Sequence, residues 1–259
     1  MPLTPTQIDK AARHLLAARR AGQPGPRIPE ACRPVALEDA LAIQRRVQAM
    51  LGAATGGWKC SLPTPERALS YAAIFAPSIF CASPCPVTTR RAARIEPEIA
   101  FVLGRDLPPR KRGYDEEELR TAIAETRLAL EILGSRYREP VSATFTEVLA
   151  DQVSNEGLFV GPVLENGLAR SLGAFAIAVD GPAGPLHRRD GRHPDGHPLR
   201  PFFWLANHLA VGDDRGRLEA GQIVTTGSYA GALEVPVGAA IAVEFGALGR
   251  IEVELSAAA

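Results

Sequence analysis

From Gly56 onward the sequence is a series of short apolar runs separated by glycine and proline. Runs of this kind, bounded by turn-forming residues, are typical of β-strands. The predicted strands are Trp58–Ser61, Arg94–Leu103, Arg127–Leu133, Gly157–Val160, Ala174–Val179, Gln222–Thr226, Ala240–Phe245 and Ile251–Leu255. The stretch from Gly181 to Pro201, rich in glycine, proline and histidine, is interpreted as a long loop in which the histidines are solvated.

Apolar residues recur at helical spacing in Thr6–Ala21 and Leu37–Leu51, which predicts two amphipathic helices. Two further helices, at Asp115–Glu125 and Pro201–Val211, interrupt the predicted strands. This order lacks the regular strand and helix alternation of a doubly wound sheet, and no Gly-x-Gly-x-x-Gly motif follows a strand. We therefore expect an α+β roll, with a helical N-terminal part at residues 1–55 and a catalytic domain at 56–259.

The charge balance and the cysteine pattern indicate which kinds of binding partner to expect. The 29 basic residues balance the 29 acidic ones, so no long-range field favours nucleic acid or an anionic membrane surface. The four cysteines follow no zinc-ligand pattern, which indicates reduced, unpaired thiols. The sequence contains no signal peptide or apolar stretch long enough to span a bilayer. A small-molecule substrate and a cytoplasmic location are expected.

Two glutamates lie two residues apart in the apolar segment Arg94–Leu103. Because strand side chains alternate between faces, Glu96 and Glu98 point to the same side. Two carboxylates on one face of a buried strand repel each other and lose hydration unless a cation or a shared proton compensates. Glu131, in a second apolar run, has the same need for a partner. Three carboxylates without cysteine or histidine predict a site for a hard cation, Mg²⁺ or Mn²⁺.

Two structural alternatives explain the same glutamates without a metal. Pro97 lacks an N–H donor, so the strand could lie at a sheet edge with Glu96 and Glu98 in solvent. Alternatively, Arg94 and Arg136 could neutralise the acids through salt bridges. The sequence leaves both alternatives open.

Several motifs follow one another between Gly56 and Leu255. They are Gly57-Trp58-Lys59, Glu96-Pro97-Glu98 with the later Gly104-Arg105-Asp106-Leu107, Leu130-Glu131-Ile132 with Ser135-Arg136, Asp151–Gly161, Gly196-His197-Pro198-Leu199, Trp204-Leu205-Ala206-Asn207, Ala220–Ser228 and Phe245–Gly249. In this order they resemble the fumarylacetoacetate hydrolase superfamily, and within it the group of 2-oxopent-4-enoate hydratases and 2-oxo-3-hexenedioate decarboxylases.

The resemblance implies a mixed β-roll core, usually in homo-oligomers, with a divalent metal on Glu96, Glu98 and Glu131. It also implies that the metal binds the carboxylate and the 2-oxo group of a small 2-oxo acid. Lys59, Ser154 and Ser228 are the predicted catalytic residues, with a salt bridge as the structural alternative for Lys59 and turn capping as that for the two serines. The predicted substrate-binding residues are Arg94, Asp151, Gln152, Thr226 and Gly227.

The sequence departs from the hydratase pattern at two positions. Ser70 stands where hydratase relatives often carry an aspartate proposed for proton transfer, and Gln152 replaces their asparagine. The leading prediction is a metal-dependent hydratase, a lyase, acting on a 2-oxopent-4-enoate-like acid in aromatic degradation. A decarboxylase of the 2-oxo-3-hexenedioate type is the alternative, and a catalytically impaired homologue that binds metal and 2-oxo acid is a further one.

Overall fold

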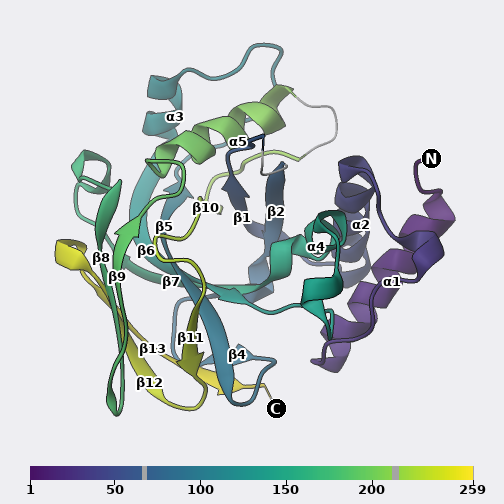
Figure 1. Ribbon diagram of the computed structural model, residues 1–259. Helices are drawn as coiled ribbons and strands as arrows, with labels where there is room; N and C mark the ends of the chain where they lie inside the picture. Colours follow the sequence, from purple (N-terminus) through teal and green to yellow (C-terminus); the bar gives the residue numbers. More distant parts are fainter. Residues whose placement is uncertain (66–68, 212–215, 259) are drawn as a thin grey trace.

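A large curved sheet forms the centre of the molecule in the computed structural model, which describes residues 1–65, 69–211 and 216–258 (Figure 1). Its strand order is β2-β1-β10-β5-β6-β7-β3, and β11 pairs with β5 next to β10. The strands are β1 (Thr55–Ser61), β2 (Ser70–Phe75), β3 (Ile79–Phe80), β5 (Ala92–Leu103), β6 (Ile123–Leu133), β7 (Asn155–Val163), β10 (Ile223–Thr225) and β11 (Leu233–Pro236). The pairs β1–β10 and β3–β7 are parallel and the others antiparallel, so the expected mixed sheet is confirmed.

A second sheet, at the lower left of Figure 1, packs against the first and has the order β4-β13-β12-β8-β9. Its strands are β4 (Cys85–Val87), β8 (Ala174–Gly181), β9 (Gly184–Arg192), β12 (Ala240–Phe245) and β13 (Arg250–Ala257). The two sheets approach closely at Gly161 of β7, where an added Cβ would lie 2.7 Å from Ile251 of β13. A glycine is needed there because any side chain would push the sheets apart.

The alternation of side chains along β5 gives the central sheet two different faces. Ile99 and Phe101 point to the main apolar core, where Phe101 packs against Phe202 of helix α5 (Leu199–Val211). Glu96 and Glu98 point to the opposite face, where Ala100 belongs to a small apolar cluster. One strand thus carries both core residues and buried acids because its period is two.

The N-terminal helices lie on one side of the central sheet (Figure 1). Helix α1 (Pro5–Ala21) begins with a capping box formed by Thr4 and Gln7, and α2 (Leu37–Leu51) packs against it. Their apolar residues share a core with Phe75 of β2, Tyr137, and Leu149 of α4 (Phe145–Ala150). The helical part is therefore packed onto the sheet, and its division from the rest at residue 55 stays a prediction.

The remaining helices are short. Helix α3 (Glu116–Ala122) lies beside α5, and single 3-10 turns occur at Glu30–Cys32, Ala76–Ser78, Pro140–Ser142, Gly167–Ala169 and Gly246–Leu248, with a left-handed turn at Gln152–Ser154. In the part of the chain that the structure describes, no helix is long and apolar enough to cross a bilayer. All four cysteines are free thiols.

Some sequence-based expectations were wrong. The stretch taken as a long loop contains strand β9, whose polar side chains are tolerated because β9 is the outer strand of its sheet. His193, expected to be solvated, is only 4% exposed. The helix expected to reach Glu125 ends at Ala122, because the following residues pair with β5 as part of β6. Strands β2, β3, β4 and β11 were not predicted. The partners of β3, β4 and β11, which are β7, β13 and β5, lie far away in the sequence, whereas β2 pairs with the preceding strand β1.

Candidate metal centre and active site

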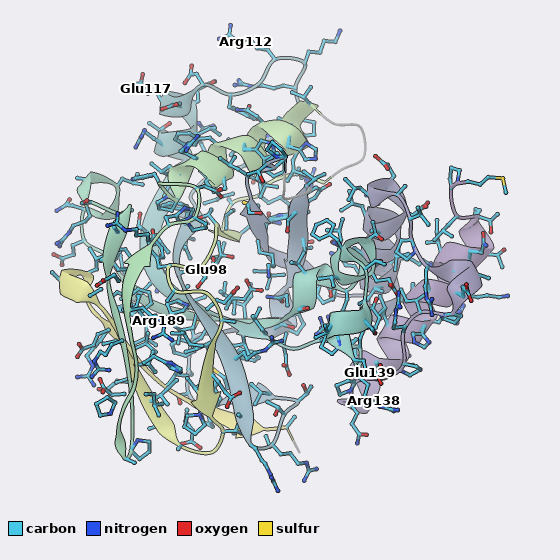
Figure 2. The ribbon with its side chains drawn as sticks, in the orientation of Figure 1. Glu98, Arg112, Glu117, Arg138, Glu139 and Arg189 are labelled. Atoms are coloured by element: carbon cyan, nitrogen blue, oxygen red, sulfur yellow. The ribbon has the colours of Figure 1, made fainter. Side chains whose placement is uncertain are left out.

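Glu96, Glu98 and Glu131 meet on the inner face of the central sheet. In the register of β5 and β6, Glu96 lies opposite Glu131, and Glu98 lies two residues further along β5. Each residue offers one carboxylate oxygen, and these oxygens lie within 4.8 Å of one another. Glu98 lies near the centre of the molecule (Figure 2). The edge-strand alternative is wrong, because β5 is paired on both sides and Glu98 is only 2% exposed.

The electrostatics of the cluster favour a positive ligand. Burial, together with the charges of Glu131 and Glu96, raises the pKa of Glu98 to about 8. Burial and the Glu131 charge also raise the pKa of Glu96. The three carboxylates thus repel one another in a poorly hydrated place, and a cation among them would relieve that repulsion.

Lys59 is the cation that the chain itself supplies. Its Nζ donates hydrogen bonds to Glu131 Oε1 and, at 3.1 Å, to the Val153 carbonyl. Burial alone would lower the pKa of Lys59, but the charges of Glu131 and Glu96 outweigh it and raise that pKa. Lys59 therefore forms the salt bridge that the structural alternative predicted. A lysine in a salt bridge can still contact a substrate, so its catalytic role stays a prediction.

The residues fit a divalent cation. One ammonium faces three carboxylates, and among the described residues the buried Glu131 Oε2 accepts no hydrogen bond. Oxygen ligands about 2.1–2.5 Å from a shared ion lie within about 5 Å of one another, as these do. The arginines do not replace a cation at the site, because Arg136 is paired with Asp151 and the charge of the exposed Arg94 lowers the pKa of Glu96 by less than burial and Glu131 raise it. Glu96, Glu98 and Glu131 therefore form a group that could hold Mg²⁺ or Mn²⁺.

The segment after β10 supports Glu98. The Gly227 N–H donates to Glu98 Oε2 at 3.0 Å. Gly227 has φ of 126°, and a Cβ there would lie 3.1 Å from Pro194, so glycine is required for this approach. The buried Thr226 hydroxyl lies 3.4 Å from His193 Nε2. Both residues thus have contacts within the protein, and their contact with substrate stays a prediction.

Asp151 and Gln152 both form hydrogen bonds with arginines of the protein. Asp151 accepts from the Arg136 backbone N–H at 2.9 Å and from Arg136 Nε at 2.5 Å. Gln152 Oε1 accepts from Arg19 Nη2 at 2.5 Å. These contacts give both residues a structural role, and substrate binding by them stays a prediction. Ser154 is half-buried next to Asn155, a residue that touches the carboxylates.

Three further positions lie at the rim of the site. Ser228 Oγ donates to the Gly231 carbonyl at 3.0 Å and accepts from the Ala230 N–H, so its hydroxyl caps a turn. Arg94 lies two residues before Glu96 on the same face of β5. Ser70 begins β2 opposite Ser61, two residues from the Lys59–Ala72 pair and on the same face. The catalytic role of Ser228 and the substrate contact of Arg94 stay predictions.

Sequence reasoning missed two groups in the site. Asn155 Nδ2 donates to Glu131 Oε1 at 2.9 Å, and the Val153 carbonyl accepts from Lys59. The asparagine lies two residues before the predicted strand Gly157–Val160, where a polar residue next to an apolar run could have drawn attention. The carbonyl could not, because backbone groups leave no signal in a sequence pattern.

Known proteins resemble this chain in sequence and in fold. No family model matches the chain. The 2-keto-4-pentenoate hydratase of Paraburkholderia xenovorans (strain LB400) is 28% identical over an alignment of 268 positions that covers 97% of this chain and 96% of that protein. The Paraburkholderia phymatum 2-keto-4-pentenoate hydratase is 29% identical over 96% of this chain and 98% of its own length. The 4-oxalocrotonate decarboxylase from Pseudomonas putida G7, complexed with magnesium and adipate, has a TM-score of 0.80 over 98% of both chains, at 20% identity.

These relatives and structural neighbours support the expected resemblance to the fumarylacetoacetate hydrolase superfamily. A more distant member, the fumarylpyruvate hydrolase from Pseudomonas aeruginosa in complex with Mn²⁺ and pyruvate, has a TM-score of 0.52 at 14% identity over 78% of this chain and 89% of that one. The fold is thus shared over 98% of the chain with the decarboxylase and over 78% of it with the hydrolase. The expected α+β fold of the fumarylacetoacetate hydrolase type is confirmed.

Proposed function

We propose that the protein is a divalent-metal-dependent lyase, a hydratase of a small 2-hydroxydienoic or 2-oxo acid of the 2-oxopent-4-enoate type. The observation that supports this most is the meeting of three carboxylates and Lys59 on one buried sheet face. Full-length relatives are 2-keto-4-pentenoate hydratases, which supports the same reaction class. A cytoplasmic location and a homo-oligomer are part of the proposal.

The side chains divide the work of such a reaction. Glu96, Glu98 and Glu131 would hold the cation, which, when bound, withdraws electrons from a 2-oxo group and stabilises negative charge on its oxygen. Lys59, with its ammonium held by Glu131 and the Val153 carbonyl, would orient the substrate carboxylate or carry a proton. Ser154 would hydrogen-bond the carboxylate or the attacking water. The apolar cluster around Ala100 and Leu158 keeps water away from the inner side.

The reaction can be tested directly. The purified protein is incubated with Mg²⁺ or Mn²⁺ and either 2-hydroxypenta-2,4-dienoate or a 2-oxo-3-hexenedioate-type diacid, and loss of dienol absorbance, hydroxy product and carbon dioxide are followed. A 4-hydroxy-2-oxo product that requires metal is the expected result. Carbon dioxide release without a hydroxy product would reject the hydratase.

Decarboxylation is the second candidate, and one position favours it. Ser70 lies on the site face of β2, at the position where the resemblance to the hydratases leads us to expect an aspartate. A decarboxylase needs no group that adds water to the carbon chain, so a serine is compatible with it. If metal and oxalate bind but neither substrate turns over, the protein is the catalytically impaired homologue.

Ser70→Asp is expected to raise hydration relative to decarboxylation by about 10-fold, because a carboxyl group at this place adds a proton donor and acceptor beside the substrate. Measurement of both products from the same reaction mixture gives the ratio. Ser70→Asn, which has the same shape without the acid, is the matched control. If Ser70→Asp and Ser70→Asn give the same ratio of hydration to decarboxylation, the carboxyl group does not determine which reaction occurs.

A further inference from the structure

The segment just before Asn155 has an unusual backbone. Gln152, Val153 and Ser154 have φ values of 53°, 53° and 59°, three consecutive left-handed residues without a glycine. This conformation is unfavourable for side chains with a Cβ, and most of all for a β-branched valine. Such strain persists only when surrounding contacts enforce it, and it is common where a site needs a group held in place.

The strained turn places a backbone carbonyl and, just after it, an asparagine side chain next to the carboxylate cluster. The Val153 carbonyl accepts from Lys59 Nζ at 3.1 Å, and the next side chain but one, Asn155, donates to Glu131. Lys59 otherwise donates only to Glu131 among the described residues. The position of the ammonium relative to the carboxylates is therefore set in part by the conformation of this turn.

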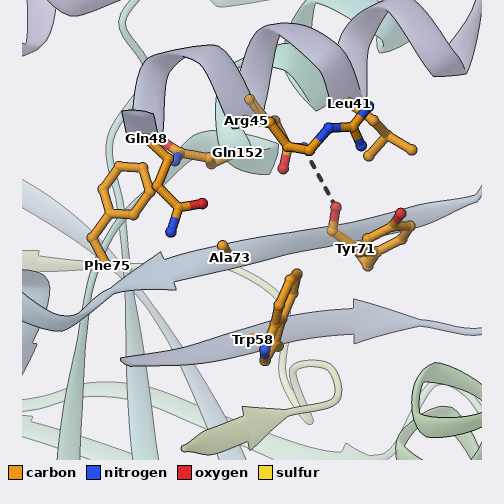
Figure 3. Close-up of a pocket in the computed structure, with 9 residues that line it drawn as sticks. Leu41, Arg45, Gln48, Trp58, Tyr71, Ala73, Phe75 and Gln152 are labelled. Atoms are coloured by element: carbon orange, nitrogen blue, oxygen red, sulfur yellow. Dashed lines mark hydrogen bonds between the residues drawn. The ribbon is translucent and has the colours of Figure 1, made fainter. Parts of the chain in front are cut away.

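Both ends of the turn are held by hydrogen bonds to the segment that follows β6. Asp151 is held by Arg136, and the Ser154 carbonyl accepts from the Gly134 N–H at 2.9 Å. In the middle, the Gln152 carbonyl accepts from the Asn155 N–H and Val153 packs against the apolar core of the N-terminal helices. The Gln152 side chain, in contrast, lines a cavity of about 30 Å³ between α2 and strands β1 and β2 (Figure 3). A space of this size, room for about one or two water molecules, gives the Gln152 side chain little packing on that side.

Arg19 of helix α1 holds the Gln152 side chain by a hydrogen bond. Its Nη2 donates to Gln152 Oε1 at 2.5 Å, and its guanidinium lies 5.4 Å from the Phe75 ring centroid. Burial and the nearby Arg136 charge lower the pKa of Arg19 to about 10, which is still high enough to keep it charged at neutral pH. A charged donor at this distance makes a strong hydrogen bond. The contact joins residues 133 positions apart in the sequence.

We infer that Arg19 is a positioning residue for Lys59: through Gln152 it holds the strained Gln152–Ser154 turn, whose Val153 carbonyl fixes the ammonium beside Glu131. This inference rests on the proposed function in so far as Lys59 acts on substrate. It gives the N-terminal helix a part in the site that the carboxylates alone do not reveal.

Arg19→Gln is the test, with Arg20→Gln on the exposed side of the same helix as the matched control. We expect kcat to fall about 10-fold or more in Arg19→Gln, because a displacement of a reacting group by about 1 Å has effects of this size. The Mg²⁺ dissociation constant should change by less than about 2-fold, since the three carboxylates are untouched. Arg19→Lys should restore part of the loss. Gln152→Ala and the double variant should give the same kcat as Arg19→Gln, because both changes break one contact.

The outcomes separate this inference from the proposed function. Wild-type protein without turnover would reject the proposed function, whereas active wild-type with equal kcat in Arg19→Gln and Arg20→Gln would reject the positioning role. A crystal structure of Arg19→Gln is decisive in either case. Residues 152–154 should leave the left-handed region and the Lys59–Val153 contact should be lost. If both persist, Arg19 does not position Lys59.

Discussion

Glu98→Gln is expected to lower the affinity for Mg²⁺ at least about 100-fold and to remove detectable turnover. Glutamine has the shape of glutamate and can still accept from the Gly227 N–H, so the strand and its neighbours need not move. It lacks the charge that a hard cation requires of its ligand, and the loss of a direct ligand should exceed the 10- to 100-fold effects measured for groups behind the ligands. Calorimetric titration with Mg²⁺ and the dienol assay measure the two effects.

The same substitution should stabilise the metal-free protein above neutral pH. The folded-state pKa of Glu98 is about 8 and its ordinary value is 4.5, so wild-type protein has the full benefit of the protonated carboxyl only below about pH 4.5. That benefit is lost as the pH rises through about 8. Glu98→Gln removes this loss, so without metal its Tm at pH 8.5 should exceed that of wild type by several degrees.

Glu125→Gln is the matched control for Glu98→Gln. Glu125 lies on the neighbouring strand β6, but its carboxylate is paired with Arg127 and is 39% exposed. Its replacement should leave Mg²⁺ affinity and turnover unchanged. Unaltered Mg²⁺ affinity in Glu98→Gln would show that the carboxylate cluster is not the metal site.

Lys59→Met is expected to lower kcat by about 10²- to 10⁴-fold while Mg²⁺ binding is retained. Methionine fills most of the space of the lysine but has no ammonium, so it cannot orient a carboxylate or carry a proton, and contributions of this kind have that size. The Glu131 carboxylate keeps its hydrogen bond from Asn155. Without the competing ammonium, the cluster should attract a cation at least as strongly as before.

The comparison of kcat with metal affinity distinguishes two roles of Lys59. If Mg²⁺ affinity falls in proportion to kcat, Lys59 acts by assembling the carboxylates and not on the substrate. Lys10→Met, at an exposed position of helix α1, controls for the loss of a positive charge and should behave as wild type.

The carboxylate cluster could be predicted from the sequence because it depends on local pattern. Glu96 and Glu98 share a face since strand side chains alternate, and the apolar neighbours of Glu131 indicate that it is buried. The resemblance implied a metal shared by all three glutamates, and the pairing of β5 with β6 in the structure brings them together. Strand β9 was missed because its polar residues look like a loop until its partner β8 is known.

The sequence by itself determined the apolar strand runs, the acids on one face of β5, the N-terminal helices and the resemblance to a superfamily, because all of these follow from residue type and short spacing. The tertiary structure decided which polar partner each of the following cations has. Lys59, and not Arg94, forms a salt bridge with Glu131. Arg136 forms one with Asp151, and Arg19 donates a hydrogen bond to Gln152. These contacts join segments far apart in the chain, and they depend on backbone conformations, such as the left-handed turn at Gln152–Ser154, that only the folded surroundings impose.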